Sequence, residues 1–314
     1  MNIDKAVIPV AGLGTRLLPT TKAIPKEMLP VGRYPIIHHV VEELIGAGIR
    51  HILFVTSRAK AAIANHFDDY SELMIHLELG HHEMREVSRF DYRQRGVEFF
   101  FTNQQVPLGQ TKPLGTGDAV ASSESFADSD PFVVAYGDSM ISSPQDPGLV
   151  ARMIASHQEH RSACTIAVQE VAQELVHQYG IVVPTPNEEN REDCRIRDLL
   201  EKPAPDQTPS RLASSARYVF SPCIFDEIRK VTPAPNGEIY LTDAILRLIH
   251  ANAVVRAVRL TPAEARHDIG NHRAYFKTFL EYALEDAEWG QEMREYLAAR
   301  LAAESDAGRN TEQL

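Results

Sequence analysis

The chain has 314 residues, 44% of them hydrophobic and 24% charged, which is the composition of an ordinary globular protein with one large domain. Its formal net charge is -11 and no long Lys/Arg cluster occurs, which excludes nucleic acid from the expected partners. Neither a basic leader with an apolar core nor a run of about 18 apolar residues is present, so we expect no membrane attachment and a cytoplasmic location.

Short apolar runs alternate with longer amphipathic stretches in the first half of the chain. The runs typical of buried strands are residues 6–10, 52–55, 97–101, 132–136 and 165–168. The stretches with helical periodicity are residues 35–47, 61–67 and 149–157. This order predicts an α/β fold that is Rossmann-like and doubly wound, with a mainly parallel mixed sheet.

The second half has more closely spaced strands. We expect strands at residues 181–183, 195–200, 217–220 and 254–260, most of them in a smaller mixed sheet laid over the first. Helices are expected at residues 241–252 and 273–303, followed by a polar tail. We therefore divide the chain into one domain at residues 1–284, with halves at about 1–168 and 169–284, and a C-terminal helix and polar tail at residues 285–314.

A glycine-containing turn, AGLGTR at residues 11–16, directly follows the first strand. Small residues leave backbone N–H groups accessible to a phosphate, and Arg16, Lys22 and Lys26 add positive charge along the following Pro-rich loop. The dinucleotide fingerprint fails because Leu17 stands where a third Gly is required. Several cations beside open amides suit a nucleoside triphosphate.

The run at residues 5–31, KAVIPVAGLGTRLLPTTKAIPKEMLPV, resembles the signature of the bacterial UDP-glucose pyrophosphorylases, a branch of the sugar nucleotidylyltransferases. The resemblance covers nearly the whole chain, and KEMLP at residues 26–30 is typical of the uridylyl branch. It implies an enzyme that converts UTP and glucose 1-phosphate to UDP-glucose and pyrophosphate with Mg2+. It further implies a nucleotide-binding first half, a sugar-binding second half and a homodimer or homotetramer.

The same resemblance assigns roles to individual residues. Arg16, Lys26 and Lys202 are the expected catalytic cations. The expected nucleotide-binding residues are Ala11, Gly12, Gly14, Thr15, Arg16, Lys26, Glu27, Gln110, Gly115 and Asp138. The expected sugar-binding residues are Gly180, Glu201 and Lys202, from the Y-G and E-K-P motifs. Asp138 and Asp268 each follow a strand, and two carboxylates suit one Mg2+ because this cation prefers hard oxygen ligands.

The glutamine that reads the uracil edge has two candidates. Spacing to the turn LGTGDA at residues 114–119 favours Gln110, whereas position at a strand end favours Gln104. We prefer Gln110, which makes residues 104–109 a local insertion.

Four residues depart from the family pattern and bear on the sugar and base preference. Thr116 and Asp118 change the family's G-L-G-H-A turn, Ala216 replaces Gly before R-Y-V, and Tyr240 replaces Gln in G-E-I-Q-L-T-D-A. The alternative functions are therefore a thymidylyltransferase or another sugar-1-phosphate nucleotidylyltransferase, and a catalytically silent regulatory paralogue.

Two other patterns indicate no site. Glu78 and His81 have metal-ligand spacing, but Gly80 lies between them and the segment is polar, so we interpret it as a solvated loop. The three cysteines are scattered and lack a C-x-x-C pair, so neither a disulfide framework nor a zinc site is expected.

Overall fold

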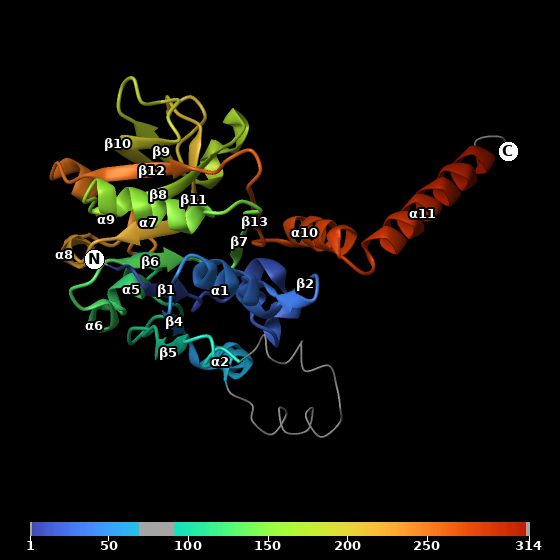
Figure 1. Ribbon diagram of the computed structural model, residues 1–314, viewed down its shortest axis with the longest axis horizontal. Helices are drawn as coiled ribbons and strands as arrows, with labels where there is room; N and C mark the ends of the chain where they lie inside the picture. Colours follow the sequence, from blue (N-terminus) through green and yellow to red (C-terminus); the bar gives the residue numbers. More distant parts are fainter. Residues whose placement is uncertain (1, 69–90, 312–314) are drawn as a thin grey trace.

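A nine-stranded sheet lies at the centre of the computed structural model, which describes residues 2–68 and 91–311 (Figure 1). Its strand order is β5-β4-β1-β6-β11-β8-β12-β10-β9. The bounds are β1 Lys5–Pro9, β4 His51–Thr56, β5 Glu98–Asn103, β6 Phe132–Ala135, β8 Cys164–Glu170, β9 Gly180–Pro184, β10 Asp193–Glu201, β11 Leu212–Phe220 and β12 Val255–Arg259. Two small antiparallel sheets pair β2 (Pro30–Val31) with β3 (Tyr34–Pro35) and β7 (Ser139–Ser142) with β13 (Ala265–Asp268).

Helices cover both faces of the central sheet. Their bounds are α1 Ile36–Gly46, α2 Ala61–Phe67, α5 Thr116–Ala121, α6 Glu124–Ala127, α7 Leu149–Glu159, α8 Cys223–Arg229, α9 Leu241–His250, α10 His272–Glu285 and α11 Gly290–Thr311. Along β1, Ala6 and Ile8 join an apolar cluster with α1, α2 and α7, whereas Val7 joins the cluster of α5, α8 and α9. This alternation follows from the two-residue period of a strand and makes three layers, helices over sheet over helices.

The predicted α/β fold is confirmed, with one correction in the second half. The strands β5, β4, β1 and β6 are parallel, as expected. The strands of the second half do not form a separate sheet over the first, because β11 pairs antiparallel with β6 and extends the same sheet. The two halves therefore share one continuous backbone hydrogen-bond network.

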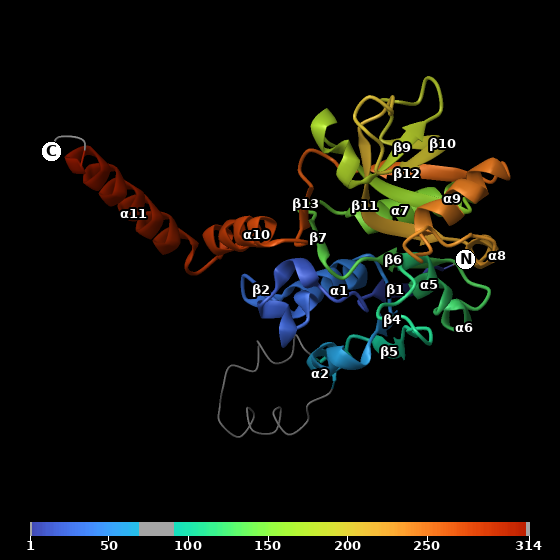
Figure 2. The ribbon, with the colours of Figure 1, turned by 180° about the vertical axis from the view of Figure 1, so that it is seen from behind.

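The C-terminal region contains two helices where the sequence predicted one at residues 273–303. The break follows α10, where the Asp286 carboxylate accepts hydrogen bonds from the backbone N–H groups of Glu288 and Trp289. Arg33 bonds the same carboxylate and fixes the corner to the loop after β2. The helix α11 continues to Thr311, beyond the expected start of the polar tail, and points away from the body of the protein (Figures 1 and 2). Among the described residues, no helix has the length and apolar character that a membrane span requires.

Candidate active site

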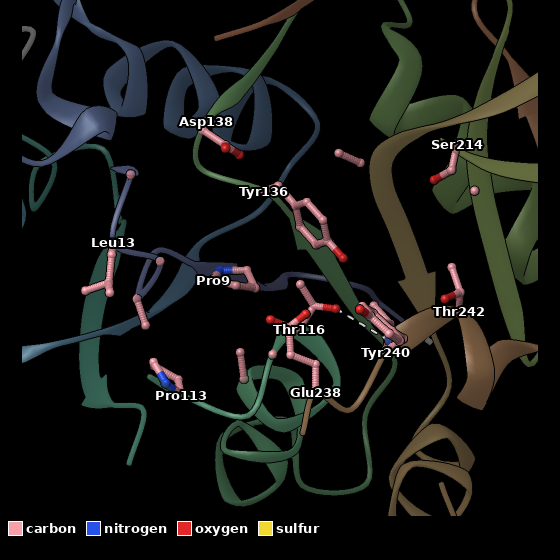
Figure 3. Close-up of a pocket in the computed structure, with 18 of the residues that line it drawn as sticks. Pro9, Leu13, Pro113, Thr116, Tyr136, Asp138, Ser214, Glu238, Tyr240 and Thr242 are labelled. Carbon is pink, nitrogen blue, oxygen red and sulfur yellow. Dashed lines mark hydrogen bonds between the residues drawn. The ribbon is translucent and has the colours of Figure 1, made fainter. Parts of the chain in front are cut away.

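A cavity of about 660 Å³ opens over the ends of β1 and β6 and reaches to β9, β10 and β11. Figure 3 shows its walls: Leu13 and Pro113 lie on one side, Ser214 and Thr242 on the other, and Asp138 and Tyr136 between them. The carboxyl ends of parallel strands are the usual ligand site in open α/β sheets, so this position fits a binding function.

The turn after β1 forms one wall of the cavity. Gly14 adopts φ of +67°, a left-handed conformation that glycine takes without a steric penalty, and its carbonyl accepts a hydrogen bond from Thr21 Oγ1 at 2.8 Å. A Cβ atom on Gly12 would come within 3.9 Å of Lys26 Nζ. The structure therefore places the Lys26 ammonium, one of the expected cations, against the turn. Arg16 also lines the cavity.

Lys26 and Asp138 form an ion pair inside the cavity, with 2.5 Å between Lys26 Nζ and Asp138 Oδ2. Burial works to lower the pKa of Lys26, but the neighbouring Asp138 and Glu27 carboxylates raise it overall. Burial works to raise the pKa of Asp138, but Lys26 holds it below its usual range. Both groups are therefore charged at neutral pH, and each stabilises the other.

Glu27 is also buried beside this pair, but its carboxylate already has a partner. Lys60, from the 3₁₀ turn before α2, donates to both oxygens of Glu27 at 2.8 and 2.7 Å. Burial raises the pKa of Glu27 and lowers that of Lys60, so each needs the other to stay ionised. Glu27 lines the cavity and anchors the Lys26 loop to α2.

A buried arginine binds the backbone of the turn that carries Asp138. Arg217 is fully buried in β11, and its guanidinium bonds Glu43 of α1 and the backbone carbonyl of Ser139, each at 2.7 Å. An arginine with five fixed donors can bind a carboxylate and backbone carbonyls together. The R-Y-V motif thus contributes a structural residue next to the site.

Asp268 lies at the end of β13, opposite Ser139 of β7, and Ile269 N donates to the Asp138 carbonyl at 3.2 Å. The structure therefore brings the two expected metal carboxylates close together, since Asp138 immediately precedes β7 and Asp268 ends the paired strand β13. The Asp268 carboxylate accepts hydrogen bonds from Arg266 Nη2 at 3.2 Å and from Gly270 N at 3.1 Å, and it is not part of the cavity wall. The pairing of β7 with β13 was not predicted, since both strands are short.

Arg266 lines the cavity and was missed by the sequence analysis. Its side chain is 8% exposed, bonds Ser139 Oγ and the Ser214 carbonyl at 3.1 Å each, and stacks 5.3 Å from the Tyr179 ring centre. It thus connects the first half of the cavity to the second. Its position two residues before Asp268 was the available signal.

The second half supplies the opposite wall. Gly180 pairs with Glu201 across β9 and β10, and a Cβ atom on Gly180 would lie 3.4 Å from Glu201 Oε2. Lys202 follows with φ of +46°, a left-handed conformation that is strained for a non-glycine residue. Its ammonium lies 3.1 Å from Glu201 Oε1 and 5.9 Å from the Tyr240 ring centre. Tyr240, which departs from the family pattern, therefore faces the lysine.

Ala216 adopts φ of +57° at an irregularity in the pairing of β11 with β8. A left-handed conformation costs an L-residue about 1–2 kcal/mol, which explains why the family pattern has Gly at this position. Ala216 lines the cavity, so its methyl group also occupies part of the wall.

The two candidate glutamines lie in different places. Gln104 directly follows β5, is 7% exposed and lines the cavity, whereas Gln110 is exposed in the loop that leads to α5 and is absent from the wall. This geometry favours Gln104 over the preferred Gln110. The chain reaches the cavity at the end of β5, and the loop that leads to α5 follows Gln104.

The remaining sequence expectations concern other groups. Glu78 and His81 lie outside the described residues. Cys164, Cys194 and Cys223 are free thiols, and burial raises the pKa of Cys194 to about 11. No cluster of three or more metal-ligating side chains occurs in the described part of the chain.

Comparisons with known proteins identify similar chains. A family model described as nucleotidyl transferase matches residues 5–285. A curated protein of Bacillus subtilis (strain 168), named UTP–glucose-1-phosphate uridylyltransferase, is 36% identical over 304 residues, which cover 96% of this chain and 99% of that protein. A Staphylococcus saprophyticus protein, UTP–glucose-1-phosphate uridylyltransferase 2, is 38% identical over 94% of this chain and 97% of its own length.

Solved structures are similar over the same extent. The UTP-bound UGPase from Acinetobacter baumannii has a TM-score of 0.81 and 33% identity, covering 95% of this chain and 99% of that one. A UDP-glucose pyrophosphorylase complexed with UDP-glucose has a TM-score of 0.76 and 30% identity, covering 91% of this chain and 100% of that one.

Proposed function

The chain belongs to the nucleotidyl transferase family and is a transferase, and we propose that it converts UTP and glucose 1-phosphate to UDP-glucose and pyrophosphate. One observation carries this proposal. A single cavity is lined by the turn at residues 11–16 and Lys26 on one side and by Gly180, Glu201 and Lys202 on the other. It therefore has a cation-bearing wall for each of two phosphorylated substrates.

The proposed reaction is an in-line displacement at the α-phosphorus of UTP. A phosphate oxygen of glucose 1-phosphate forms the new P–O bond while the bond to pyrophosphate breaks on the opposite side. The attacking phosphate has a second pKa near ~6 and is largely dianionic at neutral pH, so no strong general base is required. The protein's contribution is to position two polyanions and to neutralise charge.

The cations divide this task between the two substrates. Arg16 and Lys26 lie on the turn-bearing wall and would hold the triphosphate, and Lys202 on the opposite wall would hold the sugar phosphate. Gly180 and Glu201 would contact the sugar, with the carboxylate accepting hydroxyl hydrogen bonds. Lys26 and Lys202 each have a carboxylate partner that must release them when a phosphate arrives.

Asp138 and Asp268 fit a Mg2+ ion, because they are hard oxygen donors, one immediately before β7 and the other at the end of the paired strand β13. The ion would supply charge neutralisation on the reacting phosphates. Arg266 and Lys26 neutralise these carboxylates in the substrate-free protein.

For the base, we propose contacts with backbone groups of Ala11, Gly12 and Gly115 and with the amide of Gln104, all of which line the cavity. Thymine presents the same hydrogen-bonding edge as uracil. Preference over dTTP then depends on room for the C5 methyl group and on contacts with the ribose 2'-hydroxyl. Each is worth roughly 1 to 3 kcal/mol, which predicts a preference for UTP of tens to hundreds of fold.

We also propose that the protein assembles into a homodimer or homotetramer. Exposed apolar side chains on and between α10 and α11 support this, namely Phe276, Phe279, Leu280, Trp289, Tyr296 and Leu301.

Pyrophosphate release across a grid of nucleoside triphosphates and sugar 1-phosphates tests the proposed function. We expect the highest kcat/KM with UTP and glucose 1-phosphate. A higher value with dTTP would indicate a thymidylyltransferase, and another preferred sugar phosphate would change the sugar assignment. Release with no pair of substrates would indicate a silent regulatory paralogue.

A further inference from the structure

The side-chain amide of Gln104 is held by two neighbours at the end of the cavity near α5. Its Nε2 donates one hydrogen bond to the Gly115 carbonyl and one to Asp118 Oδ2, both at 2.8 Å. Within the described part of the chain, its Oε1 has no hydrogen-bond partner, although the side chain is 7% exposed and lines the cavity.

The chemistry of these neighbours fixes which end of the amide is the nitrogen. A backbone carbonyl oxygen can only accept, and an ionised carboxylate can only accept. Both therefore require an N–H group, and the NH2 group of Gln104 has two. A flipped amide would place its oxygen against two acceptor oxygens and lose both bonds. The orientation follows from donor and acceptor count alone.

We propose that Asp118 is a positioning residue for base selection: by holding Gln104, it leaves only the amide oxygen for the base and so selects a pyrimidine that carries a proton on N3. This inference rests on the proposed use of a nucleoside triphosphate and deepens it. Uracil has an N3–H donor, whereas N3 of cytosine is an acceptor. An oxygen fixed toward N3 attracts the first and repels the second.

The carboxylate at position 118 is one of the departures from the G-L-G-H-A turn of the family pattern. Asp118 lies in the first turn of α5, and Gly115, the other acceptor, immediately precedes the helix with φ of +94°. A short segment thus supplies both acceptors, and the glutamine reaches them from the end of β5. Asp118, a departure from the family pattern, thus has a role, because it accepts the second hydrogen bond of the Gln104 NH2 group.

The test compares Asp118→Ala and Asp118→Asn with the unaltered protein. Ala removes one acceptor and frees one amide proton, whereas the Asn oxygen can still accept from Gln104. The ratio of kcat/KM for UTP to that for CTP is expected to fall about tenfold in Asp118→Ala and to stay within about threefold in Asp118→Asn. Asp130→Asn is the control, because Asp130 pairs with Lys5 away from the cavity.

A merely structural role of Asp118 would lower the use of UTP and CTP equally and leave their ratio unchanged. An unchanged ratio in Asp118→Ala would therefore overturn the inference. A ratio that falls equally in Asp118→Asn would also overturn it, because charge and not hydrogen-bond acceptance would then be responsible.

Direct binding of UTP, CTP and 3-methyl-UTP by calorimetry separates this inference from the proposed function. 3-methyl-UTP lacks the N3 proton and is expected to bind the unaltered protein at least tenfold more weakly than UTP. If no UDP-glucose is formed but the binding preference depends on Asp118, the proposed function fails and the inference stands. If UDP-glucose is formed and the preference is independent of Asp118, the inference fails alone. If neither UTP nor CTP binds, the proposed function and the inference are both overturned.

Discussion

At the scale of single residues, the cavity contains charges that are paired before any substrate binds. Lys26 is paired with Asp138, Arg266 with Asp268 and Lys202 with Glu201. Pairing offsets the cost of holding these charges in the cavity, and phosphate oxygens can then replace the carboxylates as partners of the cations. The first two predictions at this scale concern the removal of charged residues of the cavity region.

Asp138→Asn and Asp268→Asn are each expected to lower kcat by at least about a hundredfold while weakening UTP binding by less than about tenfold. The bound cation neutralises phosphate charge most strongly in the transition state. A neutral amide holds that cation less firmly than a carboxylate does. Single-turnover kinetics and equilibrium binding measure the two effects. Near-normal turnover of either variant removes that residue from the proposed metal site.

Lys202→Ala is expected to raise KM for glucose 1-phosphate, and Arg16→Ala to damage the use of UTP. The two cations lie on opposite walls of the cavity and belong to motifs for which we propose different substrates. Steady-state kinetics with each substrate varied in turn distinguish the effects. Equal changes in both apparent affinities for both variants contradict this division.

His157 is expected to make stability depend on pH. Burial lowers its pKa to about 4 from an ordinary 6.5, and it bonds Thr165 Oγ1 and Ser221 Oγ at 3.1 Å each. Because the unfolded chain binds the proton first, stability is fully present above pH 6.5 and is lost as pH falls toward 4, by about 2 kcal/mol at pH 5. Urea unfolding at several pH values should show a smaller loss in His157→Gln than in the unaltered protein. Parallel pH profiles for the two proteins would contradict the assignment.

At the scale of elements, the sequence predicted the strands and helices that have a regular apolar pattern. It missed the short elements that form only by contact with a partner element. The apolar runs located β1, β4, β6 and β8 because buried parallel strands are continuously hydrophobic. It missed β7 and β13, four residues each, whose pairing brings Asp138 near Asp268. It also missed α8, which has seven residues. Such short elements form through tertiary contacts, so their own periodicity is weak.

For the cavity, the sequence predicted some of the residues that the structure brings together. Motif positions placed both cation-bearing walls, including Arg16, Lys26 and Lys202, at one cavity. Spacing favoured Gln110, whereas the structure places Gln104 in the cavity wall, because spacing along the chain does not show which side chain is buried. The roles of Arg266 and Arg217 depend on cross-strand contacts that a single sequence does not display.

The anchoring of the Lys26 loop to α2 predicts a large effect on stability. Lys60→Met is expected to cost about 3 to 5 kcal/mol, because it leaves Glu27 buried without a partner, with 1% of its surface exposed. Adding Glu27→Gln should recover part of this loss, since the double variant has no unpaired charge. Guanidinium unfolding of the two single variants and the double variant measures the coupling. Additive losses would mean that the ion pair is not coupled.

At the scale of the whole molecule, the helix α11 forms an arm that leaves the body, whereas α10 packs against β2 and β13 (Figure 1). The cavity is lined by residues between Pro9 and Arg266, and none of its lining residues comes from this arm. The proposed subunit contact and the proposed chemistry would thus involve different parts of the chain.

Deletion of residues 290–314 is therefore expected to leave kcat and the thermal midpoint nearly unchanged while reducing the oligomer to a smaller species. The deleted helix includes exposed Tyr296 and Leu301 but no cavity residue. Sedimentation velocity and a pyrophosphate-release assay on the same samples check both statements. An unchanged number of subunits per particle would exclude α11 from the subunit contact. Lost turnover would show that the cavity depends on α11.

The pairing of β6 with β11 has a consequence for synthesis of the protein on the ribosome. Until Leu212–Phe220 has emerged, β6 has no partner on that side, and its backbone N–H and C=O groups form an open edge. A nascent chain of about 200 residues thus exposes the apolar strand Phe132–Ala135 at the point where its sheet should continue. Premature termination between these two strands would yield a fragment prone to edge-to-edge aggregation, and productive folding has to wait for the second half.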